Sequence, residues 1–198
     1  GIYSNARKVK YMSKANKSNK AIKYRLYPND EQKVMFAKTF GCCRFVYNQL
    51  LALQKQRYKD GESHLSKLKS NEFATRTLKK DYDFLKEIDK FAVSNAVFHL
   101  ADAYDRFFKK QNHFPKFKSK RKSKKSYTTN FTNNNILIGK NVIKLPKVGM
   151  VKAVIHKLPK DDWKLKSVTV SQDGVGNYFA SVLFEYEQED IPSVSKSS

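Results

Sequence analysis

The sequence predicts an α+β protein, in which a small antiparallel β-barrel of about seven strands holds a helical region inserted after its first strand. Three observations lead to this prediction. Residues 21–27 alternate between apolar and charged side chains, residues 29–110 repeat apolar side chains at helical spacing, and six short strand-like runs follow residue 126. A closed or nearly closed barrel is favoured because closure removes exposed strand edges.

The first elements are a strand and two helices. The alternation in residues 21–27 is typical of a half-buried strand, and a proline ends it. Asn29 or Asp30 can cap a helix that runs to Gly41, and a second helix then continues to Asp60. Two helices joined at a glycine suggest a helix-turn-helix, but an αα-hairpin that only packs fits the same pattern.

Further helices are predicted before residue 110. Residues 62–90 favour one helix and a turn, and residues 91–110 give the clearest helix of the chain. Its polar side chains fall opposite an apolar stripe, which we expect to pack into the core. The stripe contains Val93, Ala96, Val97, Leu100, Tyr104, Phe107 and Phe108.

The remaining strands are short runs of β-branched and aromatic residues that turn-forming residues separate. They span residues 127–131, 136–138, 142–145, 151–156, 167–172 and 178–186. The expected domains are a barrel of residues 21–28 and 126–187, an inserted helical domain of residues 29–125 with a basic loop at 109–125, a basic extension at 1–20 outside the fold, and a tail at 188–198.

The excess of basic residues indicates which kind of partner the protein binds. The 198 residues contain 40 Lys and Arg against 18 Asp and Glu, a formal net charge of +22, so a polyanion is expected beside the protein. The segment 114–135 runs a dense, aromatic-containing cationic stretch into a strand rich in amides and hydroxyls. Such cations neutralise phosphates, and the amides and hydroxyls can contact sugars or bases. A disordered, merely solvated charge run is the alternative.

No catalytic or metal-binding residues are predicted. The four histidines are scattered, the common hydrolase and nucleotide-binding motifs are missing, and Glu185, Glu187, Glu189 and Asp190 indicate a solvated strand end. Cys42 and Cys43 are adjacent, which suits buried apolar residues in a reducing compartment better than a disulfide or a metal site. No apolar run reaches the roughly 20 residues of a membrane span. We therefore expect a cytoplasmic protein that is not an enzyme by itself.

Six short blocks, taken together, resemble a known family. They are residues 21–29 (AIKYRLYPN), 41–48 (GCCRFVYN), 89–92 (DKFA), 114–118 (FPKFK), 131–135 (FTNNN) and 145–149 (LPKVG). In this order they are similar to the N-terminal half of TnpB (OrfB), a family of transposon-associated RNA-guided nucleases related to the type V CRISPR effectors. The resemblance implies a wedge-type barrel with an inserted recognition lobe.

The resemblance also implies partners and site residues. Family members bind a guide RNA, recognise a short motif beside a double-stranded DNA target, and cut with a RuvC-like nuclease that uses magnesium and zinc; the carboxylates and cysteine pairs of that nuclease are absent here. The resemblance assigns motif reading to Lys90, Ser94, Asn95, Thr132 and Asn133. It assigns RNA binding to Lys109, Lys110, Lys116, Lys118, Lys120, Arg121, Lys124 and Lys125. For Ser94 and Asn95 the alternative is that they only cap their helix near Asp89.

The functional hypothesis is therefore a nucleic-acid-binding N-terminal part of a TnpB-like RNA-guided DNA endonuclease, without a nuclease domain, metal or cofactor of its own. One alternative is a guide-independent DNA-binding regulator that uses the helices of residues 30–58. Another is half of a split nuclease that a second chain completes.

Overall fold

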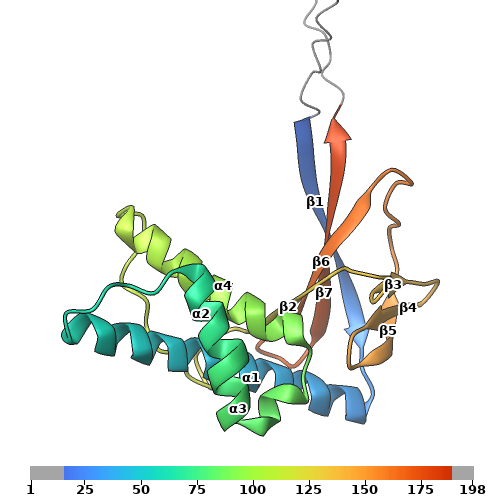
Figure 1. The fold of residues 1–198 in the computed structure, drawn as a ribbon. Coiled ribbons are helices and arrows are strands. Elements are labelled where there is room, and N and C mark those ends of the chain that lie inside the picture. The colour runs from blue at the N-terminus through green and yellow to red at the C-terminus, as the bar shows by residue number, and fades with distance from the viewer. Residues whose placement is uncertain (1–15, 189–198) are drawn as a thin grey trace, which may run out of the picture.

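The computed structural model describes residues 16–188, which form a helical layer beside one curled sheet (Figure 1). The first strand, β1 (Asn16–Tyr27), precedes all the helices. These are α1 (Asp30–Lys59), α2 (Lys67–Glu72), the π-helix η1 (Phe73–Leu78), α3 (Lys79–Asp81), the 3₁₀ helix η2 (Asp83–Lys86) and α4 (Lys90–Phe108). Six strands follow: β2 (Lys125–Asn130), β3 (Leu137–Ile138), β4 (Val142–Leu145), β5 (Gly149–Val154), β6 (Lys164–Gln172) and β7 (Tyr178–Gln188).

The predicted fold class is confirmed. All seven strands join one antiparallel sheet in the order β2-β6-β7-β1-β5-β4-β3, and the helices are inserted after its first strand. The sheet curls into a half-barrel whose edge strands are β2 and β3. The α-helices α1 and α4 lie on the side of β2 (Figure 1). Here the ring centroids of Phe36 and Phe40 of α1 lie 6.2 Å and 5.8 Å from the ring centroid of Tyr127 in β2.

The strand β1 begins earlier than predicted. It pairs with β7 from Asn16↔Gln188 to Leu26↔Tyr178, so residues 16–20 belong to the sheet and the expected extension at 1–20 is wrong for them. These residues are polar and largely exposed, which is why no alternation marks them as a strand. Residues 1–15, and residues 189–198 of the expected tail with Glu189 and Asp190, lie outside the described residues.

The predicted helix boundary at Gly41 is also wrong, because α1 runs unbroken through this residue. Its start is fixed by a capping box: the Gln32 backbone N–H donates to Asn29 Oδ1 at 2.8 Å, and the Asn29 N–H donates to Gln32 Oε1 at 3.0 Å. Buried residues recur at helical spacing on both sides of the glycine. The free energy gained by this packing outweighs the low helix propensity of glycine, which costs about 1 kcal/mol relative to alanine in a helix interior.

The core largely follows the predicted stripe on α4. Val93, Ala96, Val97, Leu100 and Tyr104 are buried as expected, as are Cys42 and Cys43, both free thiols. Phe108 is an exception, with 57% of its surface exposed at the last turn of α4. The consequence is an aromatic surface at this end of the helices.

Candidate nucleic-acid interface

The basic segment after α4 is anchored to α1. Asn48 on α1 donates from Nδ2 to the Lys118 carbonyl at 2.8 Å and accepts the Lys118 backbone N–H on Oδ1 at 2.8 Å. Pro115 is buried in the same segment. The backbone around Lys118 therefore has defined hydrogen bonds, unlike that of a disordered charge run.

A serine-bracketed turn then presents the next cations. The Ser119 N–H donates to Ser123 Oγ at 2.9 Å, and the Lys122 N–H donates to Ser119 Oγ at 3.1 Å. These bonds close the turn from both ends, so Lys120, Arg121 and Lys122 extend into solvent. None of the ion pairs found among residues 16–188 involves the basic segment 109–125.

This turn forms one wall of an open groove, which we call the basic groove, with a volume of about 740 Å³. The opposite wall is the outer face of the sheet, where Lys23 of β1, Phe179 of β7 and Ser171 of β6 lie. Six cations line the groove: Lys23, Lys120, Arg121, Lys122, Lys124 and Lys125. The one lining carboxylate, Asp173, already accepts the N–H groups of Val175 and Asn177 on Oδ1. The groove is therefore strongly positive.

Strand order brings the sheet wall together. Pairing aligns Ser126, Ser171, Phe179 and Arg25 across β2, β6, β7 and β1. The Lys23 ammonium lies 4.5 Å from the Phe179 ring centroid. The Arg25 guanidinium lies 5.5 Å from the same ring, and its Nη2 donates to Asn177 Oδ1 at 2.8 Å. Sequence reasoning did not select Lys23, Arg25 or Phe179, although the alternation in β1 places both cations on its outward face.

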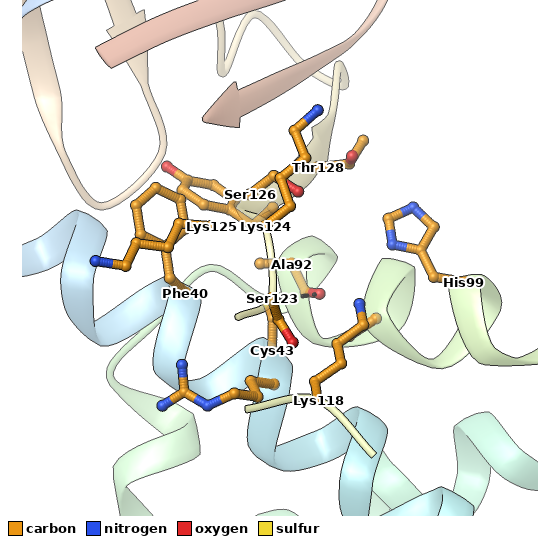
Figure 2. Close-up of a pocket in the computed structure, with 13 residues that line it drawn as sticks. Phe40, Cys43, Ala92, His99, Lys118, Ser123, Lys124, Lys125, Ser126 and Thr128 are labelled. Carbon is orange, nitrogen blue, oxygen red and sulfur yellow. Dashed lines mark hydrogen bonds between the residues drawn. The ribbon is translucent and has the colours of Figure 1, made fainter. Parts of the chain in front are cut away.

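A smaller cleft lies behind the groove, between α1, α4 and the basic segment, and Figure 2 shows its lining. Here the Lys118 ammonium is 4.2 Å from the Tyr47 ring centroid. Burial lowers the pKa of Lys118, and desolvation together with the nearby Lys118 lowers the pKa of His99. Lys124 and Lys125 also line this cleft, so several cations surround it.

The predicted RNA-binding residues do not form one cluster. Lys120, Arg121, Lys124 and Lys125 line the basic groove, and Lys118 lines the cleft behind it. Lys109 and Lys110 follow the last turn of α4, and Lys116 lines a separate hollow with Lys55 and Phe114. The structure thus divides the basic segment among the groove, the cleft and the hollow.

The predicted motif-reading residues lie at the junction of α4 and β2. Asn95 Nδ2 donates to the Thr128 carbonyl at 2.8 Å and to Asn130 Oδ1 at 3.2 Å, so this amide joins the helix to the strand. Neither Ser94 nor Asn95 caps α4, because Asp89 does so through its bond to the Phe91 N–H. Lys90, the first residue of α4, is exposed.

The other two residues, Thr132 and Asn133, lie in a turn beyond β2 and not in a strand as predicted. The Thr132 N–H donates to Asn135 Oδ1 at 2.9 Å, and the Asn135 N–H donates to the Thr132 carbonyl oxygen at 3.0 Å. Asn133 and Asn134 have φ angles of 47° and 56°, which asparagine tolerates better than most residues. Both are exposed, so the turn presents their amides to solvent.

Residues 16–188 contain no group of three or more His, Cys, Asp or Glu side chains placed to hold a metal ion. None of the helices described has the length and apolar character needed to cross a membrane.

Comparison with known proteins identifies relatives of this chain. Residues 16–63 match a family described as a helix-turn-helix domain, of the OrfB type of IS605 elements. A protein of Streptomyces pristinaespiralis, whose name proposes an RNA-guided DNA endonuclease, is 31% identical over 168 residues. InsQ of Escherichia coli K12, with a name of the same meaning, is 29% identical over 174 residues. The virulence protein VsdF of Salmonella dublin is 32% identical over 111 residues.

The alignments cover different shares of this chain and of its relatives. The first two alignments each cover 84% of this chain but only 41% and 40% of the relatives, and the third covers 51% of this chain and 93% of VsdF. In this structure the matched residues 16–63 form β1 and the single helix α1, without a turn between two helices. The order of strands and helices is the one that the family resemblance predicts, and the alignments indicate the same family. The chain belongs to the TnpB/OrfB family.

Proposed function

We propose that this chain binds a guide RNA and reads the motif beside a DNA target, as the N-terminal part of a TnpB-type RNA-guided endonuclease. The observation that carries the proposal is the basic groove, whose lining contains six cations and a single carboxylate beside a hydroxyl-bearing sheet. The names of two relatives support the choice of nucleic acid as the polyanion.

The groove suits a nucleic-acid backbone better than a small ligand. It is open and lined by residues from four segments, so it can follow an extended chain of phosphates. Ser171 adds a short hydroxyl beside the cations of the groove, and hydroxyls suit phosphates and sugar oxygens. In this arrangement the protein contacts the backbone, and base pairing by the guide selects the target sequence.

Motif reading is assigned to the turn at Thr132 and Asn133, together with Lys90 and Ser94 at the start of α4. We propose that Asn95 acts as a positioning residue, because its amide already holds Thr128 and Asn130 of β2. The turn begins two residues beyond Asn130, so Asn95 fixes the strand end from which it projects. A side chain that reads a base must offer a donor or acceptor that the protein does not use itself.

Cleavage is assigned to protein outside this chain. Phosphodiester cleavage by metal ions needs converging carboxylates, and residues 16–188 bring no such group together. We propose that the magnesium and zinc of the family nuclease bind in the rest of such a protein or in a separate nuclease half. A guide-independent regulator is less favoured, because α1 offers no second helix for a helix-turn-helix.

The proposal is tested by RNA extraction and by salt titration. A discrete structured RNA should co-purify when the chain is expressed with its guide, and its absence would favour a regulator. Changing Lys120, Arg121 and Lys124 to Ala should flatten the slope of log affinity against log salt by roughly 0.7 to 0.9 per lost phosphate contact. The matched control changes the exposed Lys140, Lys147 and Lys160. Equal slopes in both variants would show that the groove does not bind phosphates.

A further inference from the structure

A second surface, which we call the aromatic hollow, lies beside the basic segment and outside the basic groove. It is lined by Lys55 of α1 and by residues 113–117, with a volume of about 560 Å³. Phe114 is 41% exposed and Phe117 is 52% exposed. Two large apolar side chains exposed together are unfavourable in water unless a ligand covers them.

The Phe114 ring, and the backbone beside Phe117, are held in place before any ligand arrives. Phe114 packs edge-on against Tyr104 and Phe107 of α4, with ring centroids 5.5 Å and 5.1 Å apart and interplanar angles of 88° and 83°. Phe117 is adjacent to Lys118, whose backbone N–H and carbonyl both bind Asn48. Little side-chain entropy at Phe114, and little backbone entropy beside Phe117, would therefore be lost when a flat ligand stacks in the hollow.

A cation stands over both rings. The Lys55 ammonium lies 4.5 Å from the Phe117 ring centroid and 5.6 Å from that of Phe114. Lysine is long and flexible, so it can leave the ring face and pair with an anion beside the hollow. His113 and Lys116 also line the hollow, and no carboxylate does.

We propose that the aromatic hollow binds an unpaired base of a nucleic acid, which stacks on Phe117 while Lys55 and Lys116 contact the adjoining phosphates. Exposed aromatic rings flanked by cations are the combination that binds single-stranded nucleic acid, because every base has a stacking face and every nucleotide a charge. The absence of carboxylates from the lining favours this ligand over an apolar segment of a protein.

The hollow and the basic groove belong to one binding path. Phe117 and Lys120 are three residues apart, so their Cα atoms are at most about 11 Å from each other. A single-stranded stretch next to a structured RNA can therefore occupy both surfaces. The inference rests on the proposed function in requiring a nucleic-acid ligand, but it concerns a different site and a different type of contact.

The experiment measures binding of the 198-residue chain to a short single-stranded RNA of mixed sequence and to the matching duplex. Phe117→Leu keeps an apolar side chain but removes the aromatic face, and Phe117→Trp restores it. We expect Phe117→Leu to weaken single-strand binding by about five- to a hundredfold, with the salt slope unchanged, because stacking releases no counterions. Duplex binding should stay within about twofold, since duplex bases already stack on one another.

Controls separate this inference from the proposed function. Phe84→Leu changes another exposed phenylalanine, 42% exposed in η2, and should leave both ligands unaffected. Lys55→Gln should weaken binding and flatten the salt slope by about 0.7, the value for one single-strand phosphate. If single-strand binding by Phe117→Leu equals that of the unchanged chain, or if both ligands weaken equally, the stacking site is refuted while the groove proposal stands. If the unchanged chain binds neither ligand, both fail.

Discussion

The anchor between Asn48 and Lys118 gives the sharpest test of how the chain holds its basic segment. Asn48→Ala removes two hydrogen bonds of 2.8 Å without changing any charge. Each such bond contributes about 0.5 to 1.5 kcal/mol net, so the segment should lose about 1 to 3 kcal/mol of anchoring free energy. Because the atoms are only partly buried, water can replace the lost partners, and the penalty should not exceed this range.

Limited trypsin digestion measures the effect directly, since residues 116–125 offer many cleavage sites. When a segment opens and closes faster than it is cut, its cleavage rate follows the population of the open state. A loss of 1 to 3 kcal/mol corresponds to cleavage about 5- to 150-fold faster. The control is Asn112→Ala, whose exposed side chain accepts only the neighbouring His113 N–H among the described residues.

Nucleic-acid binding supplies the second measurement. Asn48→Ala should bind more weakly because the ligand must order a segment that the amide no longer holds, yet its salt slope should match that of the unchanged chain since all cations remain. Unaltered cleavage in the segment 116–125 would refute the anchoring role. A flattened salt slope would instead mean that Asn48 contributes to the charge contacts themselves.

Three further predictions concern other parts of the chain. Gly41→Ala should raise the free energy of unfolding by about 0.5 to 1 kcal/mol in urea titrations, because a Cβ there meets only Arg44 at 3.7 Å; a loss would mean that the helix needs the glycine. Asn133→Ala should relax the preference among DNA duplexes with randomised flanking bases by about 1 to 3 kcal/mol and leave RNA affinity intact; a uniform loss would remove it from base reading. Burial raises the pKa of Cys43 from 9.0 to about 12, so the unfolded thiol releases its proton first and stability should fall as pH rises from 9 towards 12. In thermal melts at pH 8 and pH 10.5, Cys43→Ala should reduce this fall, and an unchanged fall would assign it to other groups.

The sequence predicted those parts of the fold in which burial imposes a period. Strand β4 was placed correctly at 142–145, because Ile143 and Leu145 are buried while their neighbours are not. The first five residues of β1 were missed because they are polar and are held by pairing with β7, which no local pattern reveals. The helix boundary predicted at Gly41 was wrong for the opposite reason. The low helix propensity of glycine is a local signal, and it is outweighed by the core contacts of the buried residues before and after Gly41 in α1.

The candidate site was predicted only in its local part. The basic segment is continuous in sequence, so its composition could be recognised directly. Its partner wall depends on the strand order, which places β1, β7 and β6 side by side although the paired residues of β1 and β7 are about 150 to 170 positions apart. Lys23 and Phe179 therefore carried no recognisable signal until the pairing register was known.

The amide-rich run after β2 shows why residue type alone overstates a binding surface. Asn135 accepts the Thr132 N–H and donates to the Asn130 carbonyl at 2.9 Å, so its side chain is used within the turn. Asn95, on the other side of the junction, is used in the same way by β2. Asn133 and Asn134, by contrast, are exposed and make no side-chain hydrogen bond found in residues 16–188. The amides that close the turn fix the backbone from which the other two project, so any base reading by an amide of this turn falls to Asn133 and Asn134.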